Sequence, residues 1–324
     1  MKASRVIAPG KIEIGEIPDP IPGPGEIVIR PRLLSLCGSD QYHLHYFPPE
    51  SYPHQWGTSG HEMIGVIEAI GPDVKSLEIG EIVLGLAPRH TAMCELFKTE
   101  NGNAVKLPEG APIEELLMAQ QLGTVIFALE KLPNLIGKTA VVIGQGSAGL
   151  FFDAMLKRLG VEKVIATDLE EPRLALAPSF GADDTFINTS DNAKAQVAEF
   201  TNGTMADLVI EAAGEIETIN LAAHLVRKRG RILFFGIPRQ ETFMFNYAAF
   251  FRAYADVVSS SGAMDEPDKR VFRAALNLIA TRKIPAGAMI THRFPFAELE
   301  AAYEIAGSRR DGAIKALIEM PGPA

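Results

Sequence analysis

The chain has 324 residues, of which 47% are hydrophobic and 22% charged, as expected of a globular protein large enough for two domains. Its 40 acidic and 31 basic residues give a formal net charge of −9, which argues against nucleic acid or an anionic membrane as the main partner. Two cysteines are too few for a disulfide framework. Because there is no apolar leader and no apolar run of about 18 residues, we expect a cytoplasmic protein without membrane contact.

Residues 1–107 consist of short strand patterns separated by turns rich in proline and glycine. Apolar and polar residues alternate in the first of these segments, and longer apolar stretches form the others. Strands are expected over residues 12–17, 26–36, 63–70 and 81–86. Many short strands without a long helix indicate a β-barrel-like domain.

Two polar motifs flank these strands. Cys37-Gly38-Ser39-Asp40 follows the segment 26–36, and Gly60-His61-Glu62 precedes the segment 63–70. A thiolate and an imidazole form a donor set that suits Zn²⁺, and a catalytic zinc keeps one coordination position open for water or substrate. Taken singly, each residue has a structural alternative, because free cysteines are usually buried and many histidines serve as hydrogen-bonded structural residues. Together they predict a metal site.

The neighbours of these two residues have defined chemical uses. A zinc-bound imidazole needs a carboxylate or carbonyl on its other nitrogen, and Asp40 is a candidate for that part. Ser39 is a candidate for the hydroxyl that passes a proton between substrate and solvent. The segment His61-Glu62-Met63-Ile64-Gly65 is not the H-E-x-x-H helix of metalloproteases, because its fifth residue is glycine.

Three tyrosine and histidine residues follow the first motif closely. Tyr42, His43 and His45 either line the substrate pocket or extend the proton relay, and a solvated loop is the alternative for His45. We count His43 among the candidate catalytic residues. One or more of the following residues are also expected to shape the pocket: Phe47, Gln55 and Trp56.

The pattern changes to alternating strands and helices over residues 108–260, which predicts βαβ units and a parallel sheet. A buried strand over 138–143 runs into Gly144-Gln145-Gly146-Ser147-Ala148-Gly149, and helical spacing follows. A second strand over 163–167 ends in Asp168. A lone G-x-G-x-x-G is weak evidence, but this one lies between a strand and a helix, as in dinucleotide-binding domains.

A physical reason favours glycine at each of the three glycine positions of this loop. Gly144 allows the tight turn, Gly146 lets the backbone approach a pyrophosphate at the helix N-terminus, and Gly149 permits close helix–strand packing. Asp168 should accept hydrogen bonds from the ribose hydroxyls and repel a 2′-phosphate, so NAD is favoured over NADP. Arg173 is the counter-argument, since a basic side chain tolerates that phosphate.

Further strands are expected over 184–188, 207–211, 231–236 and 257–260. Ligands bind at the carboxyl ends of parallel strands. The predicted cofactor-binding residues are therefore Gly144, Gly146, Ser147, Ala148, Gly149, Asp168, Arg173, Ala213, Gly236 and Ile237. The strand over 257–260 is the sixth and is a candidate to pair across a dimer edge.

Residues 261–324 form a third stretch. An amphipathic helix is expected over 266–282, a strand over 290–295, a helix over 296–307 and a strand over 314–320.

The first two motifs carry a family resemblance. Cys37-Gly38-Ser39-Asp40 and the frame Gly60, His61, Glu62, Gly65, Gly71 and Val74 resemble the zinc signature of the medium-chain dehydrogenase/reductase superfamily, above all its alcohol, polyol and threonine dehydrogenases. The resemblance implies Cys37 and His61 as ligands of one catalytic Zn²⁺, Glu62 as a carboxylate that can enter the coordination shell, and Ser39 as the relay hydroxyl. It also implies a Rossmann sheet, residues 108–260, inserted into a GroES-like barrel domain, residues 1–107 and 261–324.

Two departures from the family pattern stand out. Relatives carry a Cys, Glu or Asp as third ligand on the segment entering the cofactor domain, and Gln120 falls nearest that position here. A neutral amide is a weaker ligand, and a role in packing alone is the alternative for Gln120. The four-cysteine lobe that binds a structural zinc in many relatives is missing, so we expect no structural zinc and a core position for Cys94.

These features predict a zinc-dependent, NAD-linked alcohol or polyol dehydrogenase, in which Zn²⁺ acts as a Lewis acid on the alcohol oxygen and hydride passes to the nicotinamide. One alternative is a zinc-free, NADPH-dependent quinone or enone reductase of the same superfamily. Another is a dinucleotide-binding protein without catalysis. The substrate class stays open among alcohols, polyols and sugars, and a homodimer or homotetramer is the family expectation.

Overall fold

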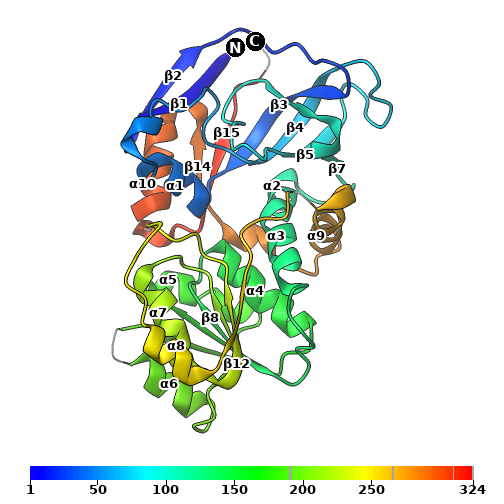
Figure 1. The fold of residues 1–324 in the computed structure, drawn as a ribbon. Coiled ribbons are helices and arrows are strands. Elements are labelled where there is room, and N and C mark those ends of the chain that lie inside the picture. The colour runs from blue at the N-terminus through cyan, green and yellow to red at the C-terminus, as the bar shows by residue number, and fades with distance from the viewer. Residues whose placement is uncertain (190–191, 265, 309, 323–324) are drawn as a thin grey trace. The chain divides into compact units, whose positions relative to one another are not determined.

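The computed structural model describes residues 1–189, 192–264, 266–308 and 310–322, and they form two compact units (Figure 1). The first unit contains Met1–Gly123 and Met264–Ala324, and the second contains Thr124–Ala263. The chain therefore leaves the first unit, forms the second and returns to the first, so the blue start and the red end of the chain belong to the same unit in Figure 1.

The first unit is built around a mostly antiparallel sheet of β14, β15, β3, β4, β5 and β7 in that order, with β6 pairing to β3. A separate hairpin joins β1 to β2. The strands are β1 (Lys2–Ala8), β2 (Lys11–Glu16), β3 (Glu26–Ser35), β4 (Glu62–Ile70), β5 (Ile82–Leu86), β6 (Phe97–Glu100), β7 (Ala104–Lys106), β14 (Ile290–Pro295) and β15 (Lys315–Glu319). One apolar core joins these strands to α10, with Ile29, Met63 and Tyr303 among its buried members.

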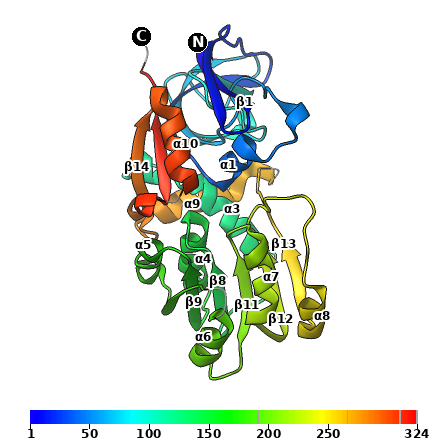
Figure 2. The ribbon, with the colours of Figure 1, turned by 90° about the vertical axis from the view of Figure 1, so that its left-hand side faces the viewer.

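The last strand of the chain completes this sheet. β15 lies antiparallel to β3, with Leu317 opposite Ser35, and parallel to β14. α10 (Leu299–Ser308) packs against β14 and β15 (Figure 2). The other helices of the unit are α1 (Gly38–His45), α2 (Ile113–Leu117), the first turn of α3 (Ala119–Leu129) and α9 (Arg270–Ala280).

The second unit is a parallel sheet with the strand order β10, β9, β8, β11, β12 and β13 (Figure 2). The order reverses between β8 and β11, which is the arrangement of doubly wound dinucleotide-binding folds. The strands are β8 (Thr139–Ile143), β9 (Lys163–Asp168), β10 (Asp184–Ile187), β11 (Ala206–Glu211), β12 (Val226–Phe234) and β13 (Asp256–Ser259). The helices are α4 (Ser147–Arg158), α5 (Glu171–Leu174), α6 (Ala193–Phe200), α7 (Ile216–Leu225) and α8 (Tyr247–Ala253).

Short 3-10 helices connect several of these elements. They are η1 (Pro49–Ser51), η2 (Asn101–Asn103), η3 (Ala177–Phe180), η4 (Pro267–Lys269), η5 (Ala286–Met289), η6 (Phe296–Glu298) and η7 (Arg310–Gly312).

The structure contains every strand predicted from the sequence, with ends shifted by a few residues. α1, β1, β6 and β7 were not predicted, because they are short and carry mixed polar and apolar residues. The helix expected over 266–282 begins only at Arg270, because Asp268 and Lys269 have φ values of +57° and +51°, which no regular helix contains. Within the described residues, no helix is both long and apolar enough to cross a membrane.

The first unit extends past the predicted boundary at residue 107. α2 packs against β3, β4 and α9, and it buries Leu116 and Leu117 there. Segment 108–123 therefore belongs to the first unit, because its helix packs on strands and a helix of that unit. The second boundary falls after Ala263, close to the predicted residue 260.

Candidate metal centre and cofactor cradle

The junction of β3 and α1 positions Cys37. Cys37 is the N-cap residue of α1, and its backbone N–H donates to Asp40 Oδ2 at 2.8 Å. Asp40 is fully buried. The carboxylate of Asp40 thus fixes the turn that carries the Cys37 thiol and the Ser39 hydroxyl. The positive N-terminal end of α1 in turn stabilises the negative charge of Asp40.

The segment before β4 positions His61. Gly60 has φ +129°, a region that favours glycine, and a side chain there would approach Met93 N at 3.0 Å. Backbone hydrogen bonds from Ala92 to Gly60 and from Met93 to Gly57 fasten this segment to the loop after β5. The imidazole therefore enters the site from a backbone that is held on both sides.

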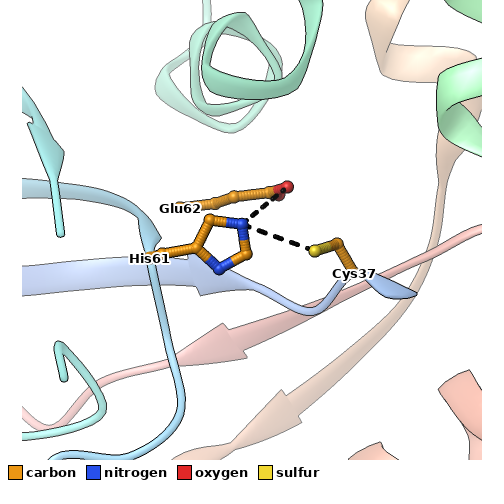
Figure 3. A group of neighbouring side chains, drawn as sticks. All are labelled: Cys37, His61 and Glu62. Atoms are coloured by element: carbon orange, nitrogen blue, oxygen red, sulfur yellow. Dashed lines mark hydrogen bonds and ion pairs between the residues drawn. The ribbon is translucent and has the colours of Figure 1, made fainter. Parts of the chain in front are cut away.

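These two segments bring the predicted ligands together. Cys37 Sγ lies 3.4 Å from His61 Nε2, and Glu62 Oε1 lies 3.8 Å from the same nitrogen (Figure 3). One ligand atom from each of the three residues lies within 4.8 Å of the others. The hydroxyl of Ser39 is 2.6 Å from Cys37 Sγ and 3.5 Å from His61 Nε2.

This donor set fits a tetrahedral zinc ion. With Zn–S near 2.3 Å and Zn–N and Zn–O near 2.0–2.2 Å, tetrahedral geometry separates sulfur from nitrogen by about 3.6 Å and nitrogen from oxygen by about 3.4 Å. The observed 3.4 and 3.8 Å lie close to these separations. A thiolate, an imidazole and a carboxylate can therefore coordinate one ion without large movement.

The electrostatics of the site also favour a bound cation. Burial lowers the pKa of His61, but Cys37 and Asp40 outweigh burial and raise that pKa well above its usual value. Burial likewise raises the pKa of Asp40, and the opposing interaction with His61 brings it well below the usual range. The buried ring next to Cys37 and Asp40 thus favours its protonated form when no other cation is present, and a divalent ion at Nε2 would supply the same positive charge.

Glu62 is held by residues from both ends of the first unit. Its Oε2 accepts a hydrogen bond from Ser35, and it lies 2.5 Å from Nζ of Lys315, which is fully buried. Lys315 Nζ also donates to the Leu36 carbonyl at 3.4 Å. One carboxylate oxygen of Glu62 is therefore bound to a cation, while the other faces His61.

Three other residues singled out in the sequence are His43, Gln120 and Trp56, and each has different surroundings. The ring of His43 stacks on Phe47 and lies 4.7 Å from the ring of His90, which in turn lies 4.1 Å from His61. Gln120 is buried near the start of α3. Trp56 packs beneath the guanidinium of Arg5, against Gly15 of β2.

Cys94 differs from Cys37. It is buried, and burial raises its thiol pKa to about 12, so the sulfur stays protonated and serves as core.

In the second unit, three turns meet at the carboxyl ends of β8, β11 and β12. A Cβ at Gly149 would lie 1.8 Å from the Gly144 carbonyl oxygen, so only glycine allows this packing of α4. A Cβ at Gly144 would meet Ala213, and one at Gly214 would meet the carbonyl of Ile237, which follows Gly236. A Cβ at Gly146, by contrast, would meet only Arg173 at 3.8 Å, so the backbone there is open to approach.

The acidic end of β9 is tied to this loop. Asp168 Oδ2 accepts from the N–H of Gln145 at 2.5 Å, and Oδ1 accepts from the N–H groups of Leu169 and Glu170. Ser147 and Ala148 open α4, where the first N–H groups of a helix lack intrahelical partners and favour an anion. The structure thus assembles a cradle that fits a dinucleotide.

Two residues of the metal centre were not predicted, Lys315 and His90. Lys315 interrupts the apolar run from Ala313 to Ile318, and that interruption was the available signal of a buried charge. No sequence motif links His90 to His61, because His90 lies in a loop whose path is set by backbone contacts with residues distant in sequence.

Comparisons with known proteins agree with this geometry. A family model for the alcohol dehydrogenase GroES-like domain matches residues 23–125, and one for zinc-binding dehydrogenases matches residues 148–281. The alcohol dehydrogenase of Cupriavidus necator is 26% identical over 366 residues, which cover 98% of each chain. The human sorbitol dehydrogenase is 24% identical and covers 92% of this chain and 90% of its own. The structure of alcohol dehydrogenase TADH from Thermus sp. ATN1 has a TM-score of 0.83 at 25% identity and covers 99% of this chain and 100% of that one.

A barrel-like unit with a Cys-His-Glu donor set, together with a doubly wound sheet carrying a glycine-rich loop, defines a zinc-binding dehydrogenase. The chain belongs to the zinc-dependent medium-chain dehydrogenase/reductase superfamily. The fold class and the family predicted from the sequence are both confirmed.

Lys315→Met tests the buried ion pair. Removing the ammonium group leaves the carboxylate of Glu62 buried without its cation, so we expect the free energy of unfolding to fall by about 3–5 kcal/mol. Urea denaturation of the metal-free protein measures this change. Lys106→Met is the matched control, because Lys106 pairs with Glu81 while 52% exposed, and its loss should cost less than about 1 kcal/mol. Equal losses in the two variants would contradict the ion pair's assigned importance.

Proposed function

We propose that this protein is a zinc-dependent oxidoreductase that transfers a hydride between an alcohol or polyol and NAD. The observation that carries the proposal is the meeting of Cys37 Sγ, His61 Nε2 and Glu62 Oε1 around one position, with the hydroxyl of Ser39 beside them. Such a set holds a metal and leaves room for a substrate oxygen next to a proton acceptor.

Each residue has a part in this proposal. Cys37 and His61 would hold the ion, with Gln120 as a neutral third ligand and Glu62 as a carboxylate that can join them. Bound Zn²⁺ supplies a Lewis acid that polarises the alcohol or carbonyl oxygen. Ser39 relays the proton of the alcohol: its oxygen, within 3.5 Å of both ligand atoms, accepts that proton while the hydroxyl gives up its own toward solvent. A bound nicotinamide cofactor would supply the acceptor or donor of the hydride that the carbinol carbon exchanges.

Asp40 and His43 have supporting parts. Asp40 orients the ring of His61 from its Nδ1 side, at 3.5 Å, and fixes the turn of Cys37. His43 is proposed to extend the proton path beyond Ser39. Burial lowers the pKa of His43, so its ring is neutral near pH 7 and can accept a proton.

The function is tested by a matched pair of cysteine variants. We expect the purified wild type to contain zinc and to reduce NAD⁺ with members of a panel of secondary alcohols and polyols, read as NADH absorbance. Cys37→Ala should lose the zinc and roughly 100-fold or more of kcat/KM, since even a ligand's supporting partner is worth 10–100-fold. Cys94→Ala also removes a thiol but should keep both zinc and activity. Undiminished activity without zinc would favour a zinc-free reductase, and silence of the zinc-loaded protein across the panel would refute catalysis of this class.

The choice of NAD rests on Asp168. Its carboxylate is fixed by three backbone N–H groups at the end of β9, where a 2′-phosphate would meet a buried negative charge. Arg173, whose guanidinium lies near Gly146, is the argument for the opposite choice.

Asp168→Asn tests this choice. The amide oxygen keeps an acceptor for the loop but removes the charge, so the ratio of NADP to NAD affinity should rise by about tenfold, equal to about 1.4 kcal/mol. Fluorescence titration with both cofactors measures the ratio, and thermal unfolding of the cofactor-free variant checks the loop. An unchanged ratio would remove Asp168 from the selection of the cofactor.

We also propose a homodimer formed through β13. This strand is an edge of the parallel sheet, and Val257 on it is 42% exposed. α8, which packs on the neighbouring β12, exposes the aromatic rings of Tyr247, Phe251 and Tyr254 by 60% or more. An unpaired edge flanked by exposed aromatic side chains favours antiparallel pairing with a second copy.

Val257→Lys should convert the dimer to a monomer, because a charge on the edge opposes strand pairing. Light scattering at several concentrations gives the mass. Ile187→Lys is the matched control: Ile187 is also 42% exposed, but it lies on β10, the opposite edge of the sheet. A wild-type monomer, or a dimer lost only in the Ile187 variant, would contradict the proposed interface.

A further inference from the structure

The second unit buries an acidic side chain that the proposed mechanism does not use. Asp153 lies in the middle of α4 and is fully buried. Neither of its carboxyl oxygens makes a hydrogen bond of normal geometry among the residues that the structure describes. Aspartate is almost never fully buried without a partner, so this side chain calls for a physical explanation.

The neighbour of this carboxyl group is the side-chain amide of Gln145, which belongs to the glycine-rich loop. Gln145 is also fully buried, and its amide interacts with Asp153. Gly149 explains how the two side chains meet. Asp153 lies four residues after Gly149, on the same face of α4, and helical side chains lean toward the N-terminus. A Cβ at Gly149 would lie 3.3 Å from Gln145 Nε2, so the amide and the carboxyl group face each other across a position without a side chain.

The surroundings of Asp153 disfavour a negative charge. α4 packs on β8, β9 and η3, and neither β8 nor η3 carries a charged side chain. Among the charged groups that the structure describes, Asp183 acts on Asp153, and its charge is negative. The nearby cations have other anions: Lys157 pairs with Asp183 at 3.0 Å, and Lys163 of β9 pairs with Asp184 at 3.0 Å. Burial, aided by Asp183, raises the pKa of Asp153 well above its usual value, which favours a protonated carboxyl group that can donate a hydrogen bond.

Gln145 connects this buried pair to the cofactor cradle. Its backbone N–H donates to Asp168 Oδ2 at 2.5 Å, and its Nε2 lies 3.5 Å from the Val142 carbonyl oxygen. Its Oε1 has no hydrogen bond of normal geometry to any other described residue. A donor at Oε1 would hold the amide from both sides, and so would fix the residue between Gly144 and Gly146 from beneath the loop.

We propose that Asp153 is a positioning residue for cofactor binding, whose carboxyl O–H donates to Gln145 Oε1 and thereby holds the glycine-rich loop in the shape that receives NAD. Asp153 does not touch the cofactor and acts through Gln145. This part for Asp153 rests on the proposed function, because it takes the loop as the site of the dinucleotide. It goes beyond that function by adding a neutral acid in the interior of the second unit.

Fluorescence titration of the full chain with NADH tests the part of Asp153. Asp153→Asn keeps an uncharged donor for Gln145 Oε1 and should bind NADH within about twofold of the wild type. Asp153→Ala removes the donor and should bind NADH about fivefold more weakly, which equals about 1 kcal/mol, the net value of one hydrogen bond. Thermal unfolding of each cofactor-free variant checks that it is folded.

A double-mutant cycle shows whether the two side chains act together. Gln145→Met removes the acceptor but keeps the length of the side chain, so it should weaken NADH binding by a similar factor. Combining it with Asp153→Ala should cause no further loss, because both changes break the same interaction. Met155→Leu is the matched control, since Met155 is another buried side chain of α4 and its replacement should keep the wild-type affinity.

Infrared spectroscopy reads the proton directly. The difference between the spectra of the wild type and Asp153→Asn near pH 7 should contain the carbonyl band of a protonated carboxyl group. That band should shift when NADH binds, because the loop then holds Gln145 more firmly.

The outcomes separate this proposal from the proposed function. Undiminished NADH affinity in folded Asp153→Ala, or losses that add in the double variant, would overturn the part assigned to Asp153 and leave the dehydrogenase centre intact. Absence of the protonated-carboxyl band would also overturn it, since an ionised Asp153 cannot donate. If Asp153→Ala does not fold, the affinity of Gln145→Met and the infrared band decide. A wild type that binds no NADH would instead refute the cofactor of the proposed function, and the part of Asp153 with it.

Discussion

The structure of the metal centre depends on one constraint: the sulfur of Cys37 and the buried carboxylate of Asp40 face the two nitrogens of a single buried ring. Cys37 Sγ lies 3.4 Å from Nε2 of His61, and Asp40 Oδ1 lies 3.5 Å from Nδ1. A neutral imidazole cannot balance a thiolate and a carboxylate in a low-dielectric interior. The ring must therefore carry a proton or share its nitrogens with a cation, and the second choice is the one that provides chemistry.

The fold keeps this arrangement in place by joining segments from the two ends of the chain. Cys37 follows β3 and Glu62 opens β4, neighbouring strands of one sheet, while Lys315 comes from β15 on the other side of β3. The buried ammonium group neutralises Glu62, which would otherwise compete with Asp40 for the charge of His61. The return of the chain to its first unit is thus an electrostatic requirement as well as a topological one.

The sequence predicted those parts of the molecule that local patterns specify. Apolar stretches, the first of them alternating with polar residues, predicted the strands. The motifs around Cys37, His61 and Gly144 predicted both candidate sites, because these residues lie close in sequence to the strand ends that carry them. Lys315 and His90 could not be predicted, since their contacts with Glu62 and His61 arise only when strands or loops distant in sequence meet. Segment 108–123 was assigned to the wrong side of the boundary for the same reason, as its apolar helix gives no sign of which core it joins.

In the proposed metal centre the third ligand, Gln120, is neutral, and this changes the charge balance. An ion held by Cys37, His61 and an anionic third residue would carry little net positive charge, whereas Gln120 would contribute none of the opposing charge. A neutral amide would therefore leave a more electron-poor ion, which would polarise a substrate oxygen more strongly but be held less tightly. Glu62 can compensate, because one of its oxygens faces the ion position while Lys315 and Ser35 hold the other. Movement of that carboxylate toward or away from His61 would adjust how strongly the metal is bound without displacing either Cys37 or His61.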